Sequence, residues 1–366
     1  MVLTEDAWKL SESMQRVPQL SPFVSVSFIK NSIFDWIRGK YLNEISCPMI
    51  EYICQICREK VTESEIWIPL AHTYIQSDIR IGRVILKTIT KELLNEWIDR
   101  SDLNEETKER YKKEFMNRYQ EKLQGLVAAT ISLYAEPQRA NEIAEDEAEK
   151  AASILRIFSP GVFHPKIISC CTLFGNEHIK INKFFQIKDK KLVRIIEEIT
   201  DKPWMPWILT NKFVENIKGS GLDTISNVLL LDNKNEFQNQ VLNSLFIYSR
   251  SALAIGVEDK LIYILVAIES ILLKNDNESI QQTIGERMAF LLEEKAGKRK
   301  MIIKNVKDVY GARSRFIHHG QTIEEIESIT TFMFNSYRFF LILIMDINKF
   351  KNKLEFIEKI ETIRLS

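Results

Sequence analysis

The sequence predicts a mainly α-helical protein in which an α+β region, residues 1–234, precedes a C-terminal helical bundle, residues 235–366. Three observations support this class. At 366 residues the chain exceeds the size at which one hydrophobic core usually keeps growing. Short β-branched runs with partial alternation occur in the first part of the chain. After a change of composition at 231–235, nearly every segment has apolar residues at three- and four-residue spacing, as amphipathic helices do.

The composition is that of an ordinary globular protein. Hydrophobic residues make up 45% and charged residues 27% of the chain, which does not fit a disordered protein. The 50 basic residues equal the 50 acidic ones, so the net charge gives no reason to expect binding to a polyanion. Any contact with RNA must therefore come from a local basic patch.

The termini and the cysteines predict a cytoplasmic protein. The first ten residues, MVLTEDAWKL, lack the basic start and apolar run of a signal peptide. The longest strongly apolar stretch, around 339–347, is interrupted by Asp346, so we expect no membrane-spanning segment. Five cysteines, an odd number, fit a reducing compartment better than a disulfide framework.

Strands and helices are expected in this order within the first 234 residues. EIWIPL and DIRIGRVILKTI have the β-branched enrichment of strands. From Asn104 to about Glu136 the apolar spacing predicts one long amphipathic helix. Pro137 can occupy the first turn of a second helix that continues to Ile157. The SPGVFHP segment then breaks the chain near 158–165, and KIISCCTLF and HIKINKFFQI are expected to be strands.

The last domain is expected to contain five helices, at about 236–255, 259–274, 279–295, 299–319 and 323–350. Gly320 fits the left-handed position just after a helix end. Thr322 and Glu325 have the spacing of a capping box that would start the fifth helix. This assignment places His318 and His319 at the C-terminus of the fourth helix.

Arg313 lies on the apolar stripe of the fourth helix, which contains Ile302, Val306, Val309 and Tyr310. A guanidinium that faces a bundle interior costs several kcal/mol unless it is paired. Two explanations remain open at this point. Glu269, on the flank of the second helix, could neutralise the guanidinium, or Arg313 could face a cleft that receives a phosphate.

The histidines favour the second explanation. A helix dipole stabilises a protonated histidine at the C-terminus by roughly 0.3 to 1 kcal/mol, which suits acid or base chemistry near neutral pH. Cleavage of RNA without a metal needs a base for the 2′-hydroxyl, a cation for the charged transition state and a proton for the leaving 5′-oxygen. However, five residues on a regular helix separate Arg313 and His318 by about 140°. Joint action therefore requires a loosened last turn or a second copy of the chain.

At these residues the chain resembles a known family. YGARSRFIHHG resembles the Arg-x4-6-His signature of HEPN domains, with Arg313 as its arginine, Ser314 as the polar residue after it and His318 as its histidine. AIESILL at 267–273 and IGERMAFLL at 284–292 are similar to the Apea-like branch of that family. The resemblance covers about the last 130 residues, while the short signature alone is common by chance.

The resemblance implies a bundle that forms a homodimer with two signatures facing one cleft. Its expected activity is endoribonuclease cleavage of RNA, with transfer RNA among the candidate substrates, that leaves 2′,3′-cyclic phosphate and 5′-hydroxyl ends without a cofactor or metal. Such domains serve in defence against phage and as toxins. Residues 1–234 would then sense a phage component or another protein. The alternative is a catalytically silent HEPN domain that binds RNA or protein.

Further residues are secondary candidates. His319 would give the alternative spacing Arg-x5-His, although His318 is the preferred histidine of the signature. Arg315 could reach an RNA phosphate, but a solvated helix face is the simpler explanation. Glu269 and Arg287 could form an ion pair that orients Arg313. Cys54 and Cys57 have half of a zinc-site pattern without nearby partners, so buried thiols are the preferred interpretation.

Overall fold

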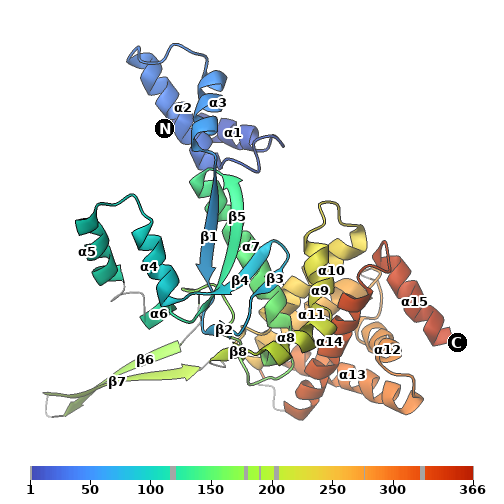
Figure 1. The fold of residues 1–366 in the computed structure, drawn as a ribbon. Helices are drawn as coiled ribbons and strands as arrows, with labels where there is room; N and C mark the ends of the chain where they lie inside the picture. The colour runs from blue at the N-terminus through green and yellow to red at the C-terminus, as the bar shows by residue number, and fades with distance from the viewer. Residues whose placement is uncertain are drawn as a thin grey trace. The chain divides into compact units, whose positions relative to one another are not determined.

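The computed structural model describes residues 2–115, 121–176, 180–188, 191–201, 206–275, 277–321 and 326–365. These residues form a mainly helical protein with sheets and helices mixed in the N-terminal part and helices alone after residue 210, which confirms the predicted fold class (Figure 1). The chain forms two compact units, Met1–Ile68 with Ala129–Ala148 and Pro69–Ala128 with Glu149–Ser366. The boundary expected at residue 234 falls inside the second unit and stays a prediction.

The first unit contains three helices, a strand pair and the start of a fourth helix. Its elements are α1 (Val2–Gln15), α2 (Val26–Tyr41), α3 (Met49–Lys60), β1 (Thr62–Pro69), most of β5 (Val127–Ala135) and the first half of α7 (Pro137–Ile157). The Glu136 carboxylate caps α7, because it accepts hydrogen bonds from the backbone N–H groups of Gln138 and Arg139. The predicted bounds of α7 are confirmed.

The second unit begins with short strands and helices. These are β2 (Thr73–Ile75), β3 (Ile79–Ile81), β4 (Val84–Thr88), α4 (Lys91–Asp99), α5 (Glu105–Phe115), α6 (Glu121–Leu123), β6 (Lys180–Lys188), β7 (Lys191–Asp201), β8 (Trp207–Leu209), α8 (Asn211–Gly219) and α9 (Leu222–Leu229). β3 and β4 form an antiparallel hairpin, β2 pairs in parallel with β8, and β6 pairs with β7 in an antiparallel ribbon.

Two predicted elements of this region are wrong. The single helix expected over 104–136 is divided into α5, α6 and the strand β5. Gly125, with φ +84°, turns the chain after α6 into the strand, and its N–H donates to Ile89. The strand expected at KIISCCTLF is irregular, with an isolated bridge between Leu173 and Leu70.

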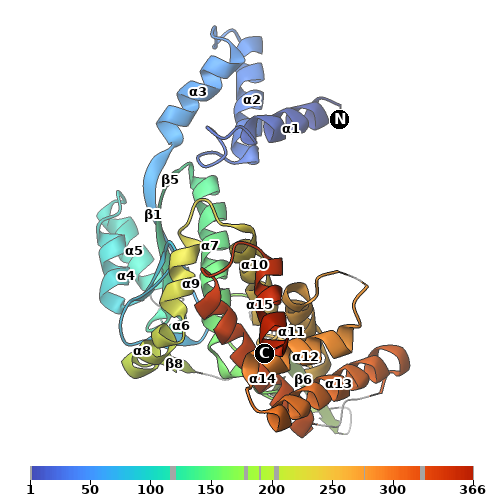
Figure 2. The same cartoon turned by 90° about the vertical axis from the view of Figure 1, so that its right-hand side faces the viewer.

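Six helices form the C-terminal region: α10 (Glu236–Arg250), α11 (Val257–Leu272), α12 (Ile280–Leu292), α13 (Ala296–His319), α14 (Ile326–Asp346) and α15 (Lys353–Leu365). The five predicted helices are present, and α15 was not predicted. Figure 2 shows these helices gathered in one bundle, in which α14 packs against α10, α11, α12 and α13. The proposed capping box of Thr322 and Glu325 lies outside the described residues.

α14 is a long apolar helix. By length and composition alone it could cross a membrane. Ten of its residues are nevertheless buried, including Phe332, Phe339 and Phe340, and four helices of the bundle cover it. This is the pattern of a core helix of a globular domain.

A buried lysine joins the loop after α7 to the bundle. The Lys260 ammonium on α11 is fully buried and donates to the backbone carbonyls of Gly161 (3.0 Å), Ile167 (2.9 Å) and Ser251 (2.9 Å). Burial lowers the pKa of Lys260 to about 7. The loop is therefore attached to the helices through a group whose charge depends on pH.

Candidate functional site

The Arg313–His318 segment forms the regular last turns of α13. The helix continues to His319 and ends at Gly320, whose φ of +61° is the left-handed conformation that the sequence predicts. The Gly320 N–H donates to the Phe316 carbonyl at 2.9 Å. Because the last turn is not loosened, Arg313 and His318 of one chain lie on different faces of α13, about 140° apart.

Arg313 is half-buried beside α11. Its Nη1 lies 3.8 Å from Oε1 of Glu269, and its side chain is 29% exposed. The Arg313 Nε is buried and has no hydrogen-bond partner in the described part of the chain. Glu269 is thus the predicted neutralising carboxylate, but at this distance the two side chains form a loose ion pair without a hydrogen bond.

Tyr310 holds the carboxylate that faces Arg313. Its hydroxyl, one turn before Arg313 on α13, donates to Oε1 of Glu269 at 2.7 Å. Burial, with the negative charge of Glu269, raises the pKa of Tyr310, so the hydroxyl stays a donor. From the sequence, Tyr310 was expected only to be part of the apolar stripe of this helix. Its three-residue spacing from Arg313 was the signal that both side chains could share one partner.

The other residues of the signature lie on the surface. His318, His319, Ser314 and Arg315 are exposed, and the two histidine rings lie 6.5 Å apart in an edge-on arrangement. Arg315 lines a small pocket of about 260 Å³ between α13 and α14 together with Asp308. The exposed histidines can exchange protons with solvent or with a bound substrate.

Arg287 does not take part in this site, which corrects the expected ion pair with Glu269. Its guanidinium is 7% exposed and donates to both carboxylate oxygens of Glu278 (2.9 and 2.7 Å) and to Glu361 at 2.9 Å. It also donates to the Leu272 carbonyl. Arg287 therefore connects α12 to the preceding segment through Glu278 and to α15 through Glu361, which is a structural role.

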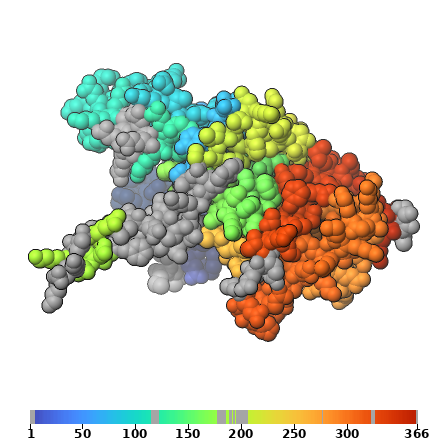
Figure 3. Space-filling model, turned by 90° about the horizontal axis from the view of Figure 1, so that it is seen from below, coloured from blue at the N-terminus to red at the C-terminus, as the bar shows by residue number. Residues whose placement is uncertain are grey.

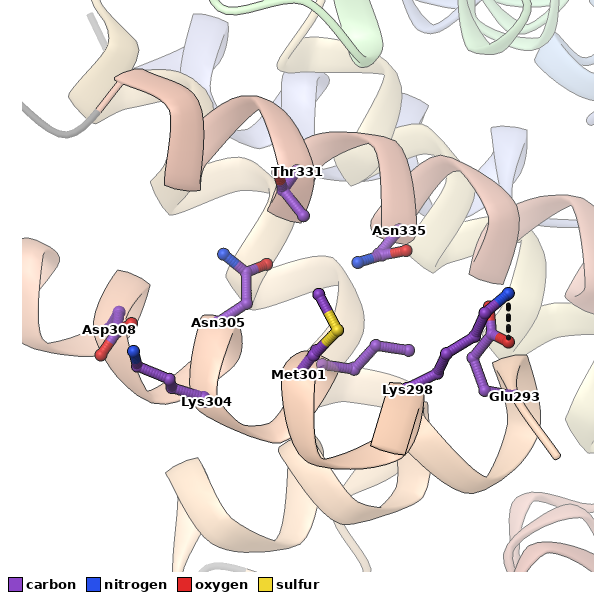
Figure 4. Close-up of a pocket in the computed structure, with 9 residues that line it drawn as sticks. Glu293, Lys298, Met301, Lys304, Asn305, Asp308, Thr331 and Asn335 are labelled. Carbon is purple, nitrogen blue, oxygen red and sulfur yellow. Dashed lines mark ion pairs between the residues drawn. The ribbon is translucent and has the colours of Figure 1, made fainter. Parts of the chain in front are cut away.

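A separate groove lies elsewhere on α13. It has a volume of about 470 Å³ and lies between the first half of α13 and α14. Figure 4 shows Lys298 beside Glu293 at one end, with the two amides Asn305 and Asn335 between the helices. The groove contains neither Arg313 nor His318 and is therefore separate from the signature.

The cysteines do not form a metal site with their described neighbours. Among the residues that the structure describes, no three His, Cys, Asp or Glu side chains lie close enough together to hold a metal ion. Cys54, which was expected to be buried, is exposed, and Cys57 is half-buried, whereas Cys170 and Cys171 are buried.

Replacing Tyr310 with phenylalanine is expected to lower the free energy of unfolding by about 1.5 to 3 kcal/mol, the contribution of a hydrogen bond to a charged group. The carboxylate of Glu269 would lose its short hydrogen bond from the Tyr310 hydroxyl, whereas the phenylalanine ring would fill the same space as the tyrosine ring. Urea unfolding of the parent and Tyr310→Phe proteins measures the difference. A change below about 0.5 kcal/mol, the size of an ordinary surface substitution, would mean that the hydrogen bond contributes nothing.

Neither family models, curated proteins nor solved structures gave a match to this chain.

Proposed function

We propose that the chain is a metal-independent endoribonuclease of HEPN type that acts in the cytoplasm as a homodimer. In this proposal His318 is the general acid or base and Arg313 binds the scissile phosphate. The attacking 2′-oxygen loses its proton, bonds to phosphorus and expels the 5′-oxygen, which takes up a proton. The products are a 2′,3′-cyclic phosphate and a 5′-hydroxyl end. Ser314, His319, Arg315 and Glu269 remain accessory candidates.

The observation that carries the proposal is the incomplete pairing of Arg313. Within the described ranges its guanidinium has one loose ion pair and donates no hydrogen bond, although arginine has five N–H donors. Its carboxylate partner is occupied by Tyr310 at the shorter distance of 2.7 Å. A guanidinium in this condition has donors left for the two oxygens of a phosphate.

The orientation of the two side chains supports a site shared by two copies. On the regular helix α13 one copy cannot aim both Arg313 and His318 at one phosphate. Two copies related by a twofold axis can place Arg313 of one chain opposite His318 of the other. Residues 1–234 would then carry the region that senses a phage component or a protein trigger.

The test is incubation of the purified protein with total RNA and with transfer RNA in excess EDTA, followed by analysis of the new ends. Cleavage with cyclic-phosphate and 5′-hydroxyl ends is expected from the parent and not from His318→Ala. Cleavage that stops in EDTA, or equal cleavage by both proteins, would contradict the proposal.

The second candidate is a catalytically silent HEPN module that binds RNA or a protein. The observation that favours it is the same 140° separation, because a single copy presents a phosphate-binding arginine without a nearby acid or base. A protein that shifts RNA in a gel and never cuts it, with or without EDTA, would support this function.

A further inference from the structure

The β6–β7 ribbon is a two-stranded sheet that no other described strand extends. Its register runs from Lys180 opposite Asp201 to Lys188 opposite Lys191. In Figure 3 the described atoms of its outer part lie away from the helical bundle. A two-stranded ribbon is only marginally stable alone in water, so contact with a ligand would stabilise it.

Charge is separated along this ribbon. Within 184–188 and the opposing 191–196 there are three basic residues and no acidic one; the basic residues are Lys188, Lys191 and Arg194. The acidic residues of β7, Glu197, Glu198 and Asp201, all lie in its last part, opposite the start of β6. In a chain with a net charge of zero, the outer half of the ribbon is therefore a local basic patch.

Apolar side chains accompany these charges. Phe185 is 64% exposed and Ile187 is 57% exposed, and the side chains of Lys191 and Arg194 are exposed as well. Phe185 lies opposite Ile195, and the neighbouring pair is Gln186 and Arg194. Proteins bind single-stranded nucleic acids where bases can stack on an exposed aromatic ring and phosphates can pair with nearby cations. On this ribbon the ring and the cations lie on opposite faces, so one strand would reach both by passing around the ribbon's edge.

We infer that the outer part of the β6–β7 ribbon binds a single-stranded segment of an RNA that passes around the ribbon, with a base on Phe185 on one face and phosphates at Lys191 and Arg194 on the other. This inference rests on the proposed ribonuclease function, for which it supplies a substrate-binding surface outside the Arg313–His318 segment. Double-stranded RNA fits less well, because its major groove is too narrow and deep to admit the ribbon and its bases are not free to stack.

The experiment measures binding of the full-length protein to a fluorescent 2′-O-methyl oligouridylate of about 12 nucleotides, a length within the usual site sizes. This probe lacks the 2′-hydroxyl and cannot be cleaved. Fluorescence anisotropy is recorded at several salt concentrations. Lys191→Glu with Arg194→Glu is expected to weaken binding and to reduce the slope of log K against log salt by about 1.4, or 0.7 for each lost phosphate contact.

Phe185→Ala is expected to weaken binding by about 5- to 150-fold with an unchanged salt slope, since stacking does not release counterions. The matched control is Lys212→Glu with Lys218→Glu, two exposed lysines on α8, which should bind like the parent. Circular dichroism of each variant verifies that it is folded.

The inference is overturned if the parent does not bind the probe, if the ribbon variants bind like the parent, or if the α8 control loses as much affinity. Equal dependence on the ribbon for a fully paired duplex overturns the assignment to single strands. If the ribbon variants bind the probe like the parent and still cleave RNA, the ribbon site is overturned and the ribonuclease proposal stands. If the parent binds the probe, the ribbon variants do not, and the parent never cleaves RNA, the ribonuclease proposal is overturned and the ribbon site stands.

Discussion

Replacing His318 with alanine is expected to lower the rate of RNA cleavage by about 10²- to 10⁴-fold, the contribution of a positioned general acid or base. Replacing Arg313 with alanine is expected to lower it by about 10²- to 10³-fold, as when a donor to a developing negative charge is removed. His318 is exposed, so its removal should leave the free energy of unfolding nearly unchanged. Single-turnover cleavage of a labelled RNA in EDTA measures both effects.

Mixing the two inactive variants tests whether the site is shared. If Arg313 of one copy acts with His318 of the other, a mixed dimer of Arg313→Ala and His318→Ala keeps one intact pair. Random exchange of subunits would then restore about a quarter of the parent activity, since half of the dimers are mixed and each has one working site of two. A site formed within one chain would give no restoration.

His319→Ala is the matched control for both measurements. It removes an exposed imidazole from the next position of the same helix end and is expected to retain cleavage. Loss of cleavage in His319→Ala with activity in His318→Ala would instead show that the Arg-x5-His register is the functional one. Full activity in all three variants would contradict a role for this helix end.

Lys260 is expected to make stability depend on pH. Its pKa is lowered by burial from 10.5 to about 7 in the folded protein. Between these values the unfolded chain binds a proton that the folded protein lacks, so stability increases as pH rises. Relative to Lys260→Met, the free energy of unfolding of the parent should rise by up to about 1.4 kcal/mol per pH unit between pH 7 and 10.5, or about 5 kcal/mol in all.

Urea unfolding at pH 7, 8 and 9 measures this difference. At pH 7 about half of the Lys260 groups in the folded protein are charged, and at pH 9 nearly all are neutral amines, which keep two N–H donors for the three carbonyls. Between pH 7 and pH 9 the parent should therefore gain about 2 kcal/mol relative to the variant, which leaves the carbonyls of Gly161, Ile167 and Ser251 without this donor at every pH. The exposed Lys212→Met is the control, and a gap that stays constant or narrows with pH would contradict the assignment.

Local signals predicted much of the fold. Pro137 and the periodic run after it defined α7, and Gly320 defined the end of α13. The helix predicted over 127–135 is wrong. The residues of this segment, VAATISLYA, have apolar side chains at helical spacing, but they also include β-branched residues that favour a strand. Pairing with other strands, which local sequence does not encode, decided in favour of β5.

One helix and one ion pair were not predicted correctly. α15 was missed although Phe356, Ile357 and Ile360 have helical spacing and are fully or almost fully buried. Glu361 of that helix is one of the two carboxylates that hold Arg287. The other carboxylate, Glu278, lies only nine residues before Arg287, so this partner was visible in the sequence and the expected pairing of Arg287 with Glu269 is wrong.

The anchoring of Lys260 also bears on how the chain can be dissected. Two of its three acceptors, Gly161 and Ile167, precede residue 235, as does Val162, which accepts a hydrogen bond from the buried Tyr248 hydroxyl. A fragment starting at 235 would carry a buried ammonium and a buried phenol without these acceptors. The loop at 160–167 is thus part of the interior of the helical bundle. A fragment that folds on its own would have to begin before this loop. The helical periodicity alone would instead suggest a fragment that begins at residue 235.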